Sequence, residues 1–452
     1  MGTILKYEGI NLLRNRISIA AIALLVVAGL YAIYYGKTEI TRQNSTITAV
    51  LEAEKIKFEK AKSAFKEPNW SVSWRTGRTV VQSPAPLSAL SIGQRDVFPY
   101  YKEVRPHSLY GGIFSNELAN PQKLLTGNFD LSFVFIFLLP LLIVALSYNV
   151  LSGEREQGTL SLILSNEISI RRLVFTKLLF RFSVVLATVL SLFFIGLVWT
   201  KTPFNTSAIA WLSMVCVYIL FWFAVSFWII GLQKSSAFNA LSLLGSWLLV
   251  VLIVPALLNL YIGTACPMSN ISDMQTEMRE MGNKGWEMKP ADAIGQYFAL
   301  FPKNRVDTTP ENSELVFDVA VVTLMDKQTQ PLFDGYRQAL KRKIAVSNAL
   351  SWLSPAAQTQ MSLNDLAHSD TDDYLSFLNN METYYGQLKG FFDGERLGNR
   401  IFEKTIYDKM PTVSAPIQPQ KMMDFWSLIK VLLLALPFFI MGFMGLKCVR
   451  NA

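Results

Sequence analysis

The chain has few residues of the kinds that disulfides and metal centres need. It contains three cysteines and two histidines among 452 residues. We place Cys216 in an apolar run, Cys266 outside the membrane and Cys448 in the cytoplasm, so no structural disulfide is expected. His107 and His368 are too few for a histidine-based metal centre.

The motifs of motors and hydrolases are also missing. No G-x-x-x-x-G-K-[ST] segment occurs, so the chain itself is not a P-loop ATPase, and neither H-E-x-x-H nor G-x-S-x-G is present. No charged residue lies in the middle of an apolar run, where proton relays and ion pathways are usually found. We therefore predict neither an enzyme nor an ion-driven transporter. The chain needs no cofactor of its own, and any energy must come from a partner.

Apolar residues are abundant instead, at 51% of the chain. Several runs are long enough to cross a hydrocarbon core, which takes about 20 residues. The first begins near Ile17 and has no small-residue cleavage site after it, which indicates an uncleaved anchor. The predicted fold is an α-helical polytopic membrane protein with six transmembrane helices. The predicted spans are 17–35, 131–150, 182–199, 208–232, 237–262 and 425–446.

Basic residues near the span ends set the orientation. With the N-terminus inside, the inner segments carry eleven Lys and Arg, whereas the short outer link carries Lys201 alone. Both termini are thus predicted to be cytoplasmic, with residues 1–16 as an amphipathic segment on the inner membrane surface. Topology then explains the net charge of +8 without nucleic acid, and membrane lipid is an expected partner. Four basic side chains before the third span are expected to reach the inner headgroups: Arg171, Arg172, Lys177 and Arg181.

Two large hydrophilic segments, 36–128 and 263–424, are predicted to be outer, mainly helical domains. In the first, a helix is expected to continue from the span over 38–66; in the second, helices are expected over 313–353 and 371–393. The first segment carries 13 Lys and Arg against 8 Asp and Glu, and the second 16 against 21. These opposite net charges allow the two domains to pack together, or each to pack against the partner domain of a second copy. The alternative is two independently solvated surfaces.

A short charged loop follows the second span and belongs to the inner segment 151–181. Its glycines permit sharp turns, its glutamates favour a helix N-terminus, and Arg155 suits bidentate pairing with acidic groups on a partner. A merely solvated turn is the alternative. The candidate site comprises Gly153, Glu154, Arg155, Glu156, Gln157, Gly158, Thr159 and Leu160.

The stretch from Leu146 to Leu160, with its E-R-E-x-G-T-L pattern, resembles the first intracellular loop of type-2 ABC transporter permeases. More specifically, the chain resembles a bacterial branch that carries two large periplasmic insertions and is grouped with multicopper-enzyme-maturation permeases. This likeness covers nearly the whole chain. The segments that carry it in the two insertions are 84–94, 99–101, 120–130, 353–356 and 363–367.

The resemblance implies a function. In such permeases the loop holds a coupling helix that docks on an ATP-binding subunit, which binds ATP and Mg²⁺. The chain would be the permease of an exporter in a bacterial inner membrane, paired with a second permease copy or a paralogue. An alternative is a mechanotransmission or scaffold subunit, which passes ATPase-driven motion to a periplasmic protein without moving a substrate across the bilayer.

Methionines in the second outer domain raise a metal hypothesis. Met274, Met278 and Met281 could bind copper(I), because thioethers are soft ligands. The favoured interpretation is a methionine stripe on a helix that packs into the domain, so these residues are weak candidates and no metal site is predicted.

Overall fold

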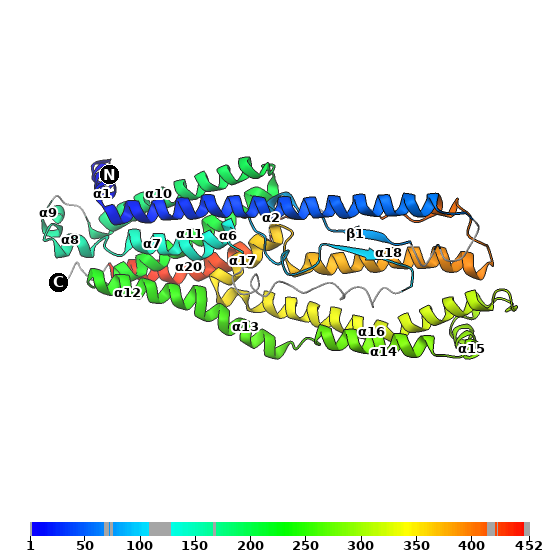
Figure 1. Ribbon diagram of the computed structural model, residues 1–452. Coiled ribbons are helices and arrows are strands. Elements are labelled where there is room, and N and C mark those ends of the chain that lie inside the picture. The colour runs from blue at the N-terminus through cyan, green and yellow to red at the C-terminus, as the bar shows by residue number, and fades with distance from the viewer. Residues whose placement is uncertain are drawn as a thin grey trace.

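The computed structural model describes residues 2–66, 72, 76–107, 128–165, 169–413, 421–422 and 424–446. Cys448 and the stretch 120–127, which the sequence analysis used, lie outside these described residues. The molecule is elongated (Figure 1). The two ends of the described chain lie at one end of the molecule, here called the terminal end, beside a bundle of apolar helices (Figure 1). The rest, here called the extension, projects from the other end of the bundle.

Within the described residues, six helices are long and apolar enough to cross a membrane, which fits the predicted polytopic α-helical fold. One antiparallel two-stranded sheet is also present there, pairing Arg78 with Val104 and Val81 with Tyr101. The elements are α1 (Gly2–Arg14), α2 (Arg16–Ser63), β1 (Arg78–Val81), η1 (Pro86–Ala89), β2 (Tyr101–Val104), α6 (Leu131–Phe133), η2 (Val134–Leu138), α7 (Leu139–Ser147), α8 (Ser152–Glu156), α9 (Leu160–Leu164), α10 (Ile170–Thr200), α11 (Thr206–Gly231), α12 (Ser236–Trp247), η3 (Leu248–Ile253), α13 (Val254–Ala265), α14 (Ile271–Trp286), α15 (Pro290–Leu300), η4 (Pro302–Asn304), α16 (Ser313–Leu350), η5 (Ser351–Leu353), α17 (Pro355–Leu366), α18 (Thr371–Leu397), α19 (Ile406–Lys409) and α20 (Phe425–Gly445).

Helix α2 runs through the bundle and far into the extension (Figure 1). It begins where the Asn15 side chain accepts hydrogen bonds from the backbone N–H groups of Ile17 and Ser18. It continues without a break for 48 residues, about 72 Å at 1.5 Å per residue. The expected continuation of the first span over 38–66 is therefore present up to Ser63.

The second and fourth membrane helices form the centre of the bundle, and their side chains explain why a proline is tolerated there. Pro140 has no N–H to donate to the carbonyl of Ile136, four residues earlier. The buried Tyr218 hydroxyl of α11 donates to that carbonyl at 3.0 Å. A neighbouring helix thus satisfies the carbonyl that the proline frees, as the apolar run with a central proline predicts.

The two outer segments pack into one extension. Phe98 from the first segment stacks on Tyr374 of α18 with 4.1 Å between ring centroids. The Gln82 side-chain amide donates to the carbonyl of Asp373 at 3.0 Å. The two segments share one apolar core cluster, in which valines of residues 72–104 meet side chains of α14, α16 and α18. The packing interpretation is therefore correct, and independent solvation is wrong.

The base of the extension reaches into the bundle core. Leu87 and Leu90, at and just after η1, and Leu363 of α17 all belong to the cluster that fills the bundle. Helix α2 passes so close to η1 that a Cβ added at Gly36 would lie 1.9 Å from the carbonyl oxygen of Ala89. Close backbone contact therefore joins the bundle and the extension.

Candidate functional site

The charged loop lies at the terminal end, beyond the bundle (Figure 1). It folds as two short helices, α8 and α9, rather than one. Gly158 separates them with φ +74°, a left-handed conformation that favours glycine. The N–H of Thr159 then donates to the carbonyl of Glu154 at 3.0 Å and closes the turn.

Glu154 is bound to the neighbouring helix α10. The Lys177 ammonium lies 2.5 Å from the Glu154 carboxylate, which also accepts a hydrogen bond from the Thr159 hydroxyl. The same ammonium lies 2.8 Å from the carboxylate of Glu8 on α1. The Lys177 side chain is only 7% exposed, so this ion pair is held away from bulk solvent.

Arg155 and Glu156 bind the turn that joins α11 to α12. The Arg155 guanidinium donates to the carbonyls of Gln233 at 2.7 Å and Lys234 at 3.0 Å. The Glu156 carboxylate accepts from the backbone N–H of Ser236 at 2.7 Å and from its hydroxyl at 2.8 Å. A cation thus meets the carbonyls after one helix, and an anion meets the first N–H groups of the next.

This geometry changes one expectation from the sequence and adds to another. Both terminal nitrogens of Arg155 donate to carbonyls of this chain, so Arg155 holds the loop to the α11–α12 turn, and its pairing with a partner's acidic groups stays a prediction. Lys177 and Arg181 do not reach headgroups: Arg181 donates to the carbonyl of Leu146 and lies 3.4 Å from the Glu8 carboxylate. Glu8 is the only acidic residue among the first 38 residues of the sequence. A single carboxylate in this basic segment was the sequence signal that could have identified the ion-pair partner of Lys177 and Arg181.

The candidate residues therefore occupy one compact segment with two sides. Gly153, Glu154, Thr159 and Leu160 are half-buried against the bundle end. Arg155, Glu156, Gln157 and Gly158 are exposed, and so is Ser161 on α9. This exposed side is accessible to a second protein, although Arg155 and Glu156 also bind the turn between α11 and α12.

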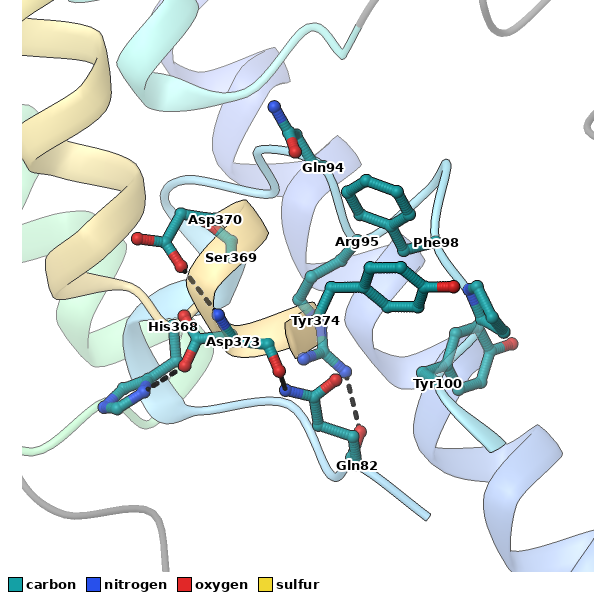
Figure 2. Close-up of a pocket in the computed structure, with 11 residues that line it drawn as sticks. Gln82, Gln94, Arg95, Phe98, Tyr100, His368, Ser369, Asp370, Asp373 and Tyr374 are labelled. Atoms are coloured by element: carbon teal, nitrogen blue, oxygen red, sulfur yellow. Dashed lines mark hydrogen bonds and ion pairs between the residues drawn. The ribbon is translucent and has the colours of Figure 1, made fainter. Parts of the chain in front are cut away.

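A second charged cluster lies at the base of the extension, and sequence reasoning missed it. Lys421, just before α20, places its ammonium 2.7 Å from the Asp365 carboxylate, 2.9 Å from that of Asp373 and 3.5 Å from that of Asp370. The His368 Nδ1 lies 2.9 Å from the other oxygen of Asp373 (Figure 2). The aspartates could be seen in the sequence, but no local pattern shows that Lys421 reaches them.

The surroundings of this cluster change the pKa values of Asp373 and Asp370 in opposite directions. Burial raises the pKa of Asp373, but hydrogen bonds from His368 and Asp370 and the charge of Lys421 lower it on balance. Burial, together with the hydrogen-bonded carboxyl of Asp373, raises the pKa of Asp370. The Asp370–Asp373 pair therefore holds a proton more readily than a free aspartate does.

The adjoining pocket is too small for a substrate. Figure 2 shows Arg95, Phe98 and Tyr374 closing it, with the Arg95 guanidinium donating to the carbonyl of Gln82 at 2.9 Å. Burial lowers the pKa of Arg95 to about 10. The cavity measures about 10 Å³, which corresponds to about one water molecule. We therefore read this cluster as a structural junction between α17, α18 and the segment that leads into α20.

The methionines take packing positions. Met274 and Met278 are 3% and 5% exposed and lie in the apolar core of the extension with Phe333 and Tyr336, while Met281 is half-buried. In the part of the chain that the structure describes, no group of three or more His, Cys, Asp or Glu side chains could hold a metal ion. Copper binding by these three methionines stays a weak hypothesis.

Comparison with known proteins places these observations in a family. A family model described as ABC-2 family transporter protein matches residues 2–444. The match thus covers both the bundle and the extension. No curated protein and no solved structure matches the chain.

Proposed function

Because the chain belongs to the ABC-2 transporter family, and so is a multi-pass membrane permease subunit of an ABC transporter, we propose that it exports a substrate with a separate ATP-binding subunit. ATP and Mg²⁺ bind that subunit. The terminal end is cytoplasmic, the extension is periplasmic, and the membrane is the inner membrane of a bacterium.

The bonds of the charged loop carry this proposal. Glu154 is bound to α10, whereas Arg155 and Glu156 are bound to the turn between α11 and α12. A partner that moves the exposed side of α8 would therefore move three membrane helices together. A merely solvated turn would need none of these bonds. They support a role in coupling ATP hydrolysis to movement of the bundle.

Exposed apolar surface supports pairing of the permease with a second copy or a paralogue. Of the most apolar part of the span Ser236–Ala265, only 11% is buried, against 67% for the span Thr206–Gly231. The sixth span, on α20, is 17% buried and the first, on α2, 28%. We propose that the fifth span faces the second permease together with the first, as the resemblance to type-2 permeases implies, and that lipid covers the rest.

The test is to obstruct the exposed side of the loop without touching its internal bonds. Gln157→Trp adds a bulky side chain there. It is expected to reduce permease-stimulated ATP hydrolysis by the partner subunit about tenfold, which corresponds to about 1.4 kcal/mol for a blocked contact at the centre of an interface. The Tm of the permease alone should not change. Lys201→Trp, at the opposite end of the bundle, is the control and should leave ATPase activity unchanged.

Glu154→Lys and Arg155→Glu test the bonds that tie the loop to the bundle. Each breaks a bond to the bundle, and each should lower ATPase stimulation while the permease still folds. Full stimulation in the Gln157 variant and in both of these would refute the coupling assignment.

A second candidate function is supported by α2. Because this helix is continuous from the bundle into the extension, movement of the first span reaches the extension without any substrate path. In this alternative the extension passes ATPase-driven motion to a periplasmic protein. A disulfide that locks the extension while substrate transport continues would contradict it, and blocked transport would not by itself favour it.

A further inference from the structure

The buried Glu8 is the starting point. It lies on α1, and the residue is 4% exposed. Its carboxylate lies 2.8 Å from the Lys177 ammonium and 3.4 Å from the Arg181 guanidinium. Lys177 in turn lies 2.5 Å from Glu154 in the loop. Two carboxylates and two cations thus balance in a cluster that solvent barely reaches.

Such a cluster is sensitive to the loss of one member. Breaking a buried ion pair is strongly destabilising, because the remaining charge keeps its desolvation cost without its partner. The Lys177 ammonium is shared between Glu8 and Glu154, so its position depends on both. If α1 moves away, Lys177 loses one of its two anionic partners, and the contact that holds the loop must rearrange.

The exposed residues of α1 have the chemistry of a membrane-binding helix. Leu5 is 37% exposed, Tyr7 61% and Leu13 73%. Lys6 and Arg14 are exposed among them. Since Glu8 is the only carboxylate of α1 and is buried, the exposed face carries positive charge alone. Apolar side chains flanked by cations favour an anionic phospholipid surface.

We propose that α1 binds the anionic phospholipid surface of the inner leaflet, and that Glu8, through Lys177 and Glu154, transmits this binding to the coupling loop. Glu8 is a positioning residue: it sets the loop's geometry and touches no substrate or nucleotide. We call this path from Glu8 through Lys177 to Glu154 the relay. Its effect on ATP hydrolysis rests on the proposed coupling function, but its effect on the geometry of the loop can be tested without ATP.

The experiment compares the full-length permease in nanodiscs of phosphatidylcholine alone and of equal parts phosphatidylcholine and phosphatidylglycerol. A spin label on Gln157→Cys, in a variant whose native cysteines are replaced by alanine, reports the mobility of the loop. With Glu8 present, the label should be less mobile in the anionic discs. With Glu8→Gln, it should be equally mobile in both.

Two further variants separate the exposed face from the buried cluster. Lys6→Gln/Arg14→Gln removes the two cations but leaves Glu8, Lys177 and Glu154 intact. Each cation near an anionic surface contributes a factor of about five to binding, so the pair should weaken the surface association about 25-fold and abolish the lipid effect. Arg172→Gln, which removes an exposed cation of α10, is the control and should keep it.

Identical label mobility in both lipids for the unaltered loop, or an undiminished lipid effect in Glu8→Gln, overturns the relay. If Glu8→Gln does not fold, the Lys6/Arg14 variant decides, because its buried cluster is intact: a retained lipid effect overturns the proposal. ATP hydrolysis with the partner subunit is measured in the same discs. A label that responds to lipid while hydrolysis does not supports the relay and refutes the coupling function.

Discussion

Replacing Asp326 by asparagine should stabilise the protein at neutral pH. Asp326 lies on α16 of the extension, and its carboxyl group accepts a hydrogen bond from the Tyr385 hydroxyl of α18. Burial raises its pKa from 3.8 to about 6, against the opposing effects of that hydrogen bond and of the Lys389 charge, and Asp393 adds to the rise. The folded protein therefore holds a proton on Asp326 more tightly than the unfolded chain does.

The sign of the pH dependence follows from this difference. Below about pH 4 the carboxyl is protonated in both states, and its contribution to stability is fully present. Between about pH 4 and 6 only the unfolded chain loses the proton, so stability falls as the pH rises. Above pH 6 the folded state carries a charge that costs about 3 kcal/mol relative to the unfolded state, at about 1.4 kcal/mol for each unit of pKa shift.

Asp326→Asn removes this cost and keeps an oxygen to accept from Tyr385. We expect the Tm at pH 7.5 to rise by about 5 °C for a folded protein of this size. The gain should vanish below about pH 4, where the native carboxyl is already neutral. Tryptophan fluorescence during heating of the full-length protein in detergent, at a series of pH values, measures both effects.

Asp334→Asn is the control, because Asp334 lies on the same helix with a side chain that is 49% exposed. Its Tm should change little at any pH, as exposed substitutions usually do. If Asp326→Asn instead lowers the Tm by several degrees from pH 5 to 8, then attraction by Lys389 outweighs burial. The raised pKa, and the reasoning built on it, would then be refuted.

Two other substitutions test the junction between bundle and extension by the same Tm measurement. Gly36→Ala should destabilise the folded protein by at least about 2 kcal/mol, since the new Cβ would meet the Ala89 carbonyl oxygen at 1.9 Å. Gly335→Ala is the control: a Cβ there has nothing within 4 Å, so this substitution should stabilise the protein by about 0.5–1 kcal/mol. Equal effects of the two substitutions would contradict the close contact at Gly36. Lys421→Met should lower the stability of the folded protein by about 2 kcal/mol near pH 8, because three carboxylates lose their cation. The loss should be smaller near pH 4, where carboxyl groups take up protons. A loss of stability that does not depend on pH would contradict this account.

The membrane helices were predictable because each depends on local composition. A run of apolar residues must cross the bilayer whatever its neighbours are, so length and hydropathy are sufficient. The ends of these helices were harder to place. Helix α10 begins at Ile170, before the predicted span 182–199, and its first turns carry Lys177 and Arg181, which meet Glu8. The pairing of Arg181 with Glu8 joins residues 173 positions apart and leaves no local pattern in the sequence.

The extension shows a different limit. Opposite net charges suggested that the two outer segments pack together, and they do, but aromatic contacts supply much of the joint. Phe58 on α2 meets Tyr407 at 5.2 Å, and Phe98 stacks on Tyr374. Net charge bears on whether two surfaces tolerate each other, whereas the shared apolar core is what fixes their geometry. The candidate loop was visible for a simpler reason: its charges had to lie outside the bilayer. Its bonds to the bundle were not visible.

The length of α2 determines what the extension can do with motion of the bundle. The hydrocarbon core takes up about 30 Å of its roughly 72 Å, so about 40 Å projects beyond the membrane. Contacts at both ends of this projection join it to the extension: Gly36 meets η1 at the base, and Phe58 packs on Tyr407 nearer the far end, with 5.2 Å between ring centroids. A tilt of about 5° at the membrane would therefore carry the far end of the extension about 4 Å, by the geometry of a rigid helix. If the charged loop moves the membrane helices as proposed, the extension must move with them, whether its task is to release a substrate or to act on a partner.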